Sequence, residues 1–128
     1  MLVVLDTNIL VSSLWSKDGA PAKIVSMILQ GILVPCYDCR ILREYRDVLL
    51  RPKFQFAPHE VNVLLDWIEI SGEPIIAKTS QTFFEDKADK KFFEVALTCE
   101  AILITGNLKH FPKSPLIQSA SEFLKNLE

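Results

Sequence analysis

Apolar residues follow two alternating patterns along this chain, and each pattern predicts one kind of element. Short runs of consecutive apolar residues, typical of buried strands, cover 2–5, 32–34, 74–77, 101–104 and 116–117. Apolar residues spaced three and four apart, typical of helices, cover 21–30, 39–51, 58–71, a stretch around 92–97 and a terminal stretch around 123–127. A turn over 8–11, capped by Asp6 or Thr7, is expected after the first strand.

The alternation of strands and helices predicts the fold class. We expect an α/β fold with three layers (α/β/α), built on a mainly parallel central sheet as a single domain over residues 1–128. Asp6 directly follows the first strand. It is therefore expected at the carboxyl edge of the sheet, where open α/β sheets place their chemistry.

Composition excludes several classes of protein. With 49% hydrophobic and 23% charged residues the chain is not intrinsically disordered, and no apolar run reaches the length of a membrane span. The N-terminus does not resemble a signal peptide, and three cysteines make no disulfide framework, so a reduced cytoplasmic location is expected. A net charge of −2 argues against a large basic nucleic-acid footprint, but not against an enzyme that contacts nucleic acid locally.

Several common sites are absent from the sequence. The four glycines are scattered singly, so there is no phosphate-binding loop, and the two histidines form no zinc motif. Cys36 and Cys39 form one CxxC pair without a second pair or a histidine cluster. We therefore interpret them as structural, with one buried at a strand end and the other in a first helical turn.

Acidic residues are the best candidates for chemistry. Asp6 ends a strand, Glu44 lies beside the apolar face of its helix, and Asp86 and Asp89 open a later helix. Carboxylates that meet at one sheet edge repel each other unless a cation lies between them. Mg²⁺ or Mn²⁺ prefers such oxygen ligands and supports hydrolysis of phosphate esters. Taken alone, Asp86 and Asp89 also suit the role of ordinary helix-start acids.

Four segments in order resemble the PIN-domain ribonucleases, above all the toxin components of bacterial and archaeal toxin–antitoxin pairs. They are the DTN after the first strand, REYRDVLLRPKF from residue 43, DKADKKFFEVAL from residue 86 and AILITGNLKHFP from residue 101. The resemblance covers residues 2 to about 123. It implies a Mg²⁺- or Mn²⁺-dependent endoribonuclease that leaves a 3′-hydroxyl and a 5′-phosphate, forms a homodimer and binds a cognate antitoxin.

The resemblance also assigns roles to individual residues. Asp6, Glu44 and Asp89 match the three catalytic, metal-binding acids of the family. The polar residues expected to line the site are Asn8, Thr105 and Asp86. Asn107 stands where many members have an acid, and is expected to be a neutral oxygen ligand. Asn107 and the lysines around Asp89 reduce the negative charge of the expected metal pocket.

Basic residues could hold an RNA backbone around these acids. They are concentrated in residues 40–53, 87–91 and 109–113, and Arg43, Lys91 and Lys109 are the predicted substrate-binding residues. The alternative for each is a solvated helix face with ion pairs of small net energy. Two other functions also stay open: a PIN-fold module with little catalysis that binds RNA or protein, and a phosphate-handling receiver domain, whose aspartate and lysine set fits less well.

Overall fold

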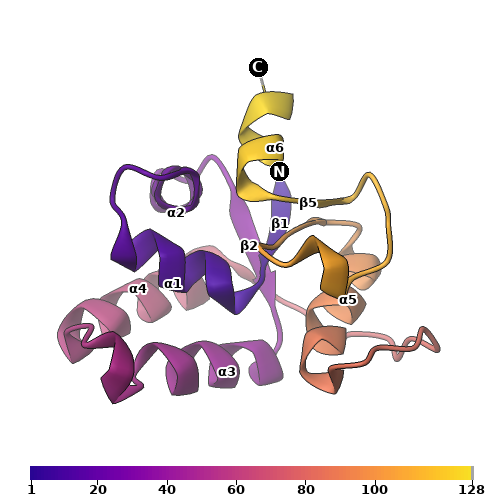
Figure 1. Ribbon diagram of the computed structural model, residues 1–128, viewed down its shortest axis with the longest axis horizontal. Helices are drawn as coiled ribbons and strands as arrows, with labels where there is room; N and C mark the ends of the chain where they lie inside the picture. Colours follow the sequence, from indigo (N-terminus) through magenta and orange to yellow (C-terminus); the bar gives the residue numbers. More distant parts are fainter. Residues whose placement is uncertain (128) are drawn as a thin grey trace.

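The computed structural model describes residues 1–127 and contains one parallel sheet (Figure 1). Its strands are β1 Leu2–Leu5, β2 Val34–Tyr37, β3 Glu73–Pro74, β4 Ile102–Ile104 and β5 Ile117–Gln118. They lie side by side in the order β3-β2-β1-β4-β5. Apolar residues of the three inner strands are almost completely buried and form the centre of the core.

Helices cover both faces of this sheet. They are α1 Thr7–Trp15, α2 Ala20–Leu29, α3 Cys39–Leu49, α4 Pro58–Ser71, α5 Lys87–Cys99 and α6 Ala120–Asn126. Figure 1 shows α1 to α4 on one side of the sheet and α5 on the other, where α5 packs on β1, β2 and β4. The expected three-layer α/β/α fold with a parallel sheet is therefore confirmed.

The strand order changes direction between β1 and β4. The chain builds outward from β1 through β2 to β3 and then returns to place β4 on the other side of β1. The amide of Asp6 donates to the carbonyl of Ile104 at 2.9 Å, so the carboxyl ends of β1 and β4 are tied together. In open α/β sheets this switch point opens a crevice outside the strand ends.

Residues 7–15 form a helix where the sequence predicted only a turn over 8–11. Asp6 occupies the N-cap position, but neither it nor Thr7 caps the helix as predicted, because both side chains bond elsewhere. Ser13 also donates back to the carbonyl of Leu10, a bond that weakens the local helix signal. Burial of Ile9 and Leu10 in the core stabilises α1 instead.

The second strand lies two residues later than predicted. The amides of Ile32 and Leu33 both donate to the carbonyl of Met27, so these residues complete the turn that ends α2. Gly31 supports that turn with a φ of 80°, which a side chain would strain. Similar shifts of one residue place β4 at 102–104 and β5 at 117–118, and β3 shortens to Glu73–Pro74. Within residues 1–127 no helix is long and apolar enough to cross a bilayer.

Candidate active site

Asp6 lies at the switch point with only 6% of its surface exposed. Its Oδ2 accepts hydrogen bonds from the Thr105 hydroxyl at 2.8 Å and the Asn8 side-chain amide at 3.2 Å. Because Asp6 follows β1, Asn8 lies in the first turn of α1 and Thr105 follows β4, three elements position this one carboxylate. The predicted placement of Asn8 and Thr105 around Asp6 agrees with this geometry.

Burial raises the pKa of Asp6 to about 6. The hydrogen bond from Thr105 lowers the pKa, while the neighbouring charges of Asp89 and Glu44 raise it further. The three predicted catalytic acids therefore share one electrostatic environment, although they come from the ends of β1, the middle of α3 and the start of α5.

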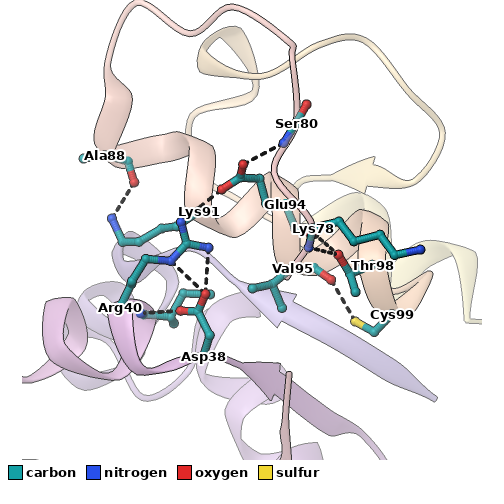
Figure 2. Close-up of polar contacts among 11 residues, drawn as sticks. Asp38, Arg40, Lys78, Ser80, Ala88, Lys91, Glu94, Val95, Thr98 and Cys99 are labelled. Carbon is teal, nitrogen blue, oxygen red and sulfur yellow. Dashed lines mark hydrogen bonds and ion pairs between the residues drawn. The ribbon is translucent and has the colours of Figure 1, made fainter. Parts of the chain in front are cut away.

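Glu44 has partners on both carboxylate oxygens. Lys91 of α5 donates to Oε1 at 2.6 Å, and the hydroxyl of Thr7 donates to Oε2. Lys91 also donates to the carbonyl of Ala88, one turn earlier on its own helix (Figure 2). The lysine side chain is only 12% exposed, so its ammonium group lies inside the acid cluster.

Asp89 lies in the first turn of α5 and pairs with His110, whose Nδ1 is 3.2 Å from Oδ2. Burial raises the pKa of Asp89, and the neighbouring Asp86 and Glu44 add to this effect, while His110 opposes it. Asp86 itself caps α5 by accepting from the amide of Ala88 at 2.9 Å. The helix-start role considered for Asp86 is therefore present in the structure.

Asn107 is exposed at the rim of the site. Its backbone amide donates at 3.0 Å to the Thr105 hydroxyl, which in turn donates to Asp6. The amide of Gly106 donates to Asn8 Oδ1 at 3.0 Å, so the loop after β4 is bound to the start of α1. The backbone of Asn107 is thus linked to Asp6 through one intervening hydroxyl, while its predicted role as a neutral oxygen ligand stays a prediction.

The donor set suits a hard divalent cation. The neighbouring carboxylates raise the pKa of Asp6 and of Asp89, and Asp6 is also buried with a pKa of about 6. A cation bound between them would reduce this repulsion, and carboxylate oxygens are the ligands that hard cations prefer. Over residues 1–127 no three His, Cys, Asp or Glu side chains are gathered closely enough to hold a metal ion together. Lys91 instead provides a positive partner for Glu44, and His110 Nδ1 lies 3.2 Å from Asp89 Oδ2.

The three predicted substrate-binding residues differ in whether their side chains are exposed or already bonded within the protein. Arg43 and Lys109 are exposed, as RNA contacts require, whereas Lys91 is bonded to Glu44. Arg40 and Arg46 also have protein partners, because Arg40 pairs with Asp38 and Glu94 and Arg46 donates to Asn62. Cys36 is buried in β2 and Cys39 begins α3, which agrees with a structural interpretation of the CxxC.

Two supporting residues gave no signal in the sequence. Tyr45 is buried beneath the site and donates its hydroxyl at 2.6 Å to the carbonyl of Leu5, directly before Asp6. Thr7 orients Glu44 across 37 residues of sequence. In the sequence Tyr45 looked like one more apolar helix position, and Thr7 like a cap. Each role depends on a partner brought close only by the fold.

Comparisons with known proteins agree with this geometry. A family model described as PIN domain matches residues 2–109. The uncharacterized protein MJ1680 of Methanocaldococcus jannaschii is 32% identical over 108 residues, which cover 82% of this chain and 70% of that protein. No solved structure gives a significant match.

Proposed function

Because this chain belongs to the PIN domain family, a family of nuclease-type fold, we propose that it is a divalent-cation-dependent endoribonuclease. The observation that carries the proposal is the buried carboxylate of Asp6, whose pKa is raised to about 6 at the switch point of a parallel sheet. Burial of such a group costs stability, and carboxylates with strongly raised pKa values are concentrated at functional sites. Glu44 and Asp89 provide the further acids that cation-assisted hydrolysis needs.

In this proposal Asp6, Glu44 and Asp89 would hold Mg²⁺ or Mn²⁺ after a small approach of their side chains, since they are not gathered closely enough as they stand, and Asn107 would add a neutral oxygen. When bound, the cation supplies an activated water and polarises a phosphate oxygen. Thr105 and Asn8 hold Asp6 in place through their hydrogen bonds. The products are a 3′-hydroxyl and a 5′-phosphate.

The basic side chains of the site orient the RNA. Arg43 and Lys109, both exposed, bind backbone phosphates next to the acids. Lys91 neutralises Glu44 in the structure, and its ammonium group would be available to a phosphate oxygen if a cation took over that role. The function is tested by incubating the protein with single-stranded RNA and Mn²⁺ and identifying the ends formed, with an Asp6 variant as the negative control.

One observation favours a second function. Glu44 already has a positive partner in Lys91, Asp89 lies against the imidazole of His110, and Asn107 brings no charge. A PIN-fold module with little catalysis that binds RNA or protein would have such a neutralised site. RNA binding without any Mn²⁺-dependent cleavage would favour this alternative.

The biological setting that we propose is a toxin–antitoxin pair, in which a cognate antitoxin and a second copy of this chain are the protein partners. A small open reading frame directly upstream in the same operon would support this setting. Growth arrest on expression, relieved by co-expression of that upstream product, is the direct test. Light scattering of the purified protein measures its oligomeric state.

Lys91→Met should bind Mn²⁺ about tenfold more tightly than the wild type. The lysine ammonium lies 2.6 Å from Glu44 Oε1, so an incoming cation has to displace it. Without it, Glu44 keeps only the bond from Thr7 and carries one more uncompensated charge, an effect of about 1–2 kcal/mol at a partly exposed site. The measurement is calorimetric titration with Mn²⁺. Lys87→Met removes the same charge from an exposed position of the same helix and should leave the affinity nearly unchanged. Weaker Mn²⁺ binding by Lys91→Met would contradict the idea that Lys91 and the cation compete for Glu44.

Asn107→Asp should also tighten Mg²⁺ or Mn²⁺ binding, by roughly tenfold, and should lower the melting temperature of the metal-free protein. Affinity for these cations rises with the number of charged ligands, while the added carboxylate repels Asp6 until a cation binds. Metal titration and thermal unfolding measure the two effects, with Asn107→Ala as the control. An unchanged affinity in Asn107→Asp would place residue 107 outside the ligand set.

A further inference from the structure

A cavity of about 340 Å³ adjoins the acid cluster. It lies between the segment that leads into α5 and the 3-10 helix Leu108–His110, and Asp89 belongs to its wall as well as to the acids. Its other walls include Phe83, the basic residues Lys109 and His110, and the acids Glu85 and Asp86, so it combines an aromatic ring and carboxylates on one wall with basic groups on the other. Its volume lies within the range of small-ligand sites.

Phe83 presents its ring to this cavity from a fixed segment. The ring is 83% exposed, whereas the adjacent Phe84 is buried with its centroid 5.3 Å from that of Phe93. The same segment is held further back by two bonds to α5, from the amide of Lys78 to Thr98 and from the amide of Ser80 to Glu94 (Figure 2). Asp86 holds its other end as the cap of α5. The exposure of Phe83 is therefore built into the fold.

The ring of Phe83 and the two basic residues of the 3-10 helix together match one kind of ligand. Lys109 is exposed and His110 is half-exposed at the far wall, where they can bind phosphate oxygens. The aromatic ring offers a flat apolar face, on which any base can stack. A phosphate held by these basic groups would lie next to Asp89, where the proposed cleavage takes place. A nucleotide is a ligand that combines a flat base with a phosphate.

We propose that this cavity is a subsite for one unpaired base of the RNA, stacked on Phe83 next to the scissile phosphate. The inference rests on the proposed function, because it takes RNA as the substrate. It assigns a role to a residue outside the four segments that carry the family resemblance. It also implies that base-paired RNA is a poor ligand, since a paired base cannot enter the cavity.

The test uses short single-stranded RNAs that carry the fluorescent base 2-aminopurine at one position at a time, with EDTA present to prevent cleavage. The wild type should quench one position most strongly. Phe83→Ala should bind about tenfold more weakly and lose that quenching, because stacking on an aromatic ring is lost. Phe83→Tyr keeps the ring and should bind within about twofold of the wild type. Ile76→Ser changes a residue that is 97% exposed further back on the same segment and should have no effect.

Three outcomes would overturn the subsite: no RNA binding by the wild type, binding by Phe83→Ala within twofold of the wild type, or an equal loss in Ile76→Ser. The last of these would indicate a general apolar surface rather than a base site. Failure of the proposed function has a different signature, since cleavage that is absent or independent of Asp6 leaves the 2-aminopurine result intact. If cleavage depends on Asp6 but Phe83→Ala binds RNA like the wild type, the proposed function stands and the subsite is rejected.

Discussion

Asp6→Asn should reduce Mn²⁺-dependent RNA cleavage at least about a hundredfold and at the same time stabilise the metal-free protein at neutral pH. The loss of cleavage follows because Asp6 is the most buried of the three acids and the one that the Thr105 and Asn8 side chains orient. Even the groups that orient metal ligands typically contribute ten- to a hundredfold. Gel analysis of a labelled RNA measures this effect.

The gain in stability follows from the pKa. Burial raises the pKa of Asp6 from 3.8 to about 6, so the folded protein binds this proton more tightly than the unfolded chain. The contribution of Asp6 to stability is therefore fully present below about pH 4 and is lost as the pH rises through about 6. Asparagine has no such proton to lose, so the variant should be more stable at pH 7 by about 2–3 kcal/mol. Urea unfolding at pH 4.5 and pH 7 measures the difference.

Mn²⁺ provides a control for the same variant. It should raise the melting temperature of the wild type but not that of Asp6→Asn, since a cation stabilises only the state that binds it. Asn8→Ala should keep part of the cleavage, because the bond from Thr105 to Asp6 remains. Wild-type cleavage by Asp6→Asn would remove Asp6 from the catalytic set.

Glu94→Ala should lower the free energy of unfolding by about 2–3 kcal/mol, or roughly 10 °C in melting temperature, because it breaks a buried charge network. Glu94 is 5% exposed and accepts from Arg40 at 3.0 Å and from the amide of Ser80 at 2.7 Å. These bonds join α3, α5 and the segment before α5 (Figure 2). Half-exposed Arg40 regains water in the variant, so the loss stays below that of a fully buried pair.

The pH dependence of this network has the opposite sign to that of Asp6. Burial tends to raise the pKa of Glu94, but the bonds from Ser80 and Arg40 outweigh burial and lower the pKa. The stabilisation is therefore present at neutral pH and lost as the pH falls through the lowered pKa. Thermal unfolding at pH 7 and pH 3 measures it. Glu69→Ala removes an exposed helical carboxylate and should cost little; an equal loss in both variants would mean that the network adds no stability.

The fold was largely predictable because local pattern and burial agree over most of the chain. β1 is an unbroken apolar run that is buried in the centre of the sheet, and α3 and α4 keep their apolar faces between clear boundaries at proline and glycine. The prediction failed for α1. Ser12 and Ser13 interrupt its pattern and its caps are used by the site, so only tertiary burial reveals it.

The candidate site was predictable at the level of residue type and strand position. An acid after a buried strand indicates the active edge of a parallel sheet, and this placed Asp6 correctly. Contacts between distant elements were not predictable. Nothing in the spacing shows that Lys91 bonds to Glu44, or that Glu94 meets Arg40 across 54 residues. Such pairs depend on the angle at which α5 crosses the sheet opposite α3.

The pairing of β1 with β4 also sets the order in which the site forms during synthesis. The amide of Asp6 donates to the carbonyl of Ile104, and its carboxylate accepts from the Thr105 hydroxyl. Residues near the two ends of the segment that matches the PIN domain model, 2–109, therefore have to meet before the site is complete. Contacts so distant in sequence form late in folding. On the ribosome, the first hundred residues would therefore emerge without the Ile104 and Thr105 partners of Asp6. Under the proposed function, cleavage would therefore become possible only after β4 and Thr105 have been made and have paired with β1 and Asp6.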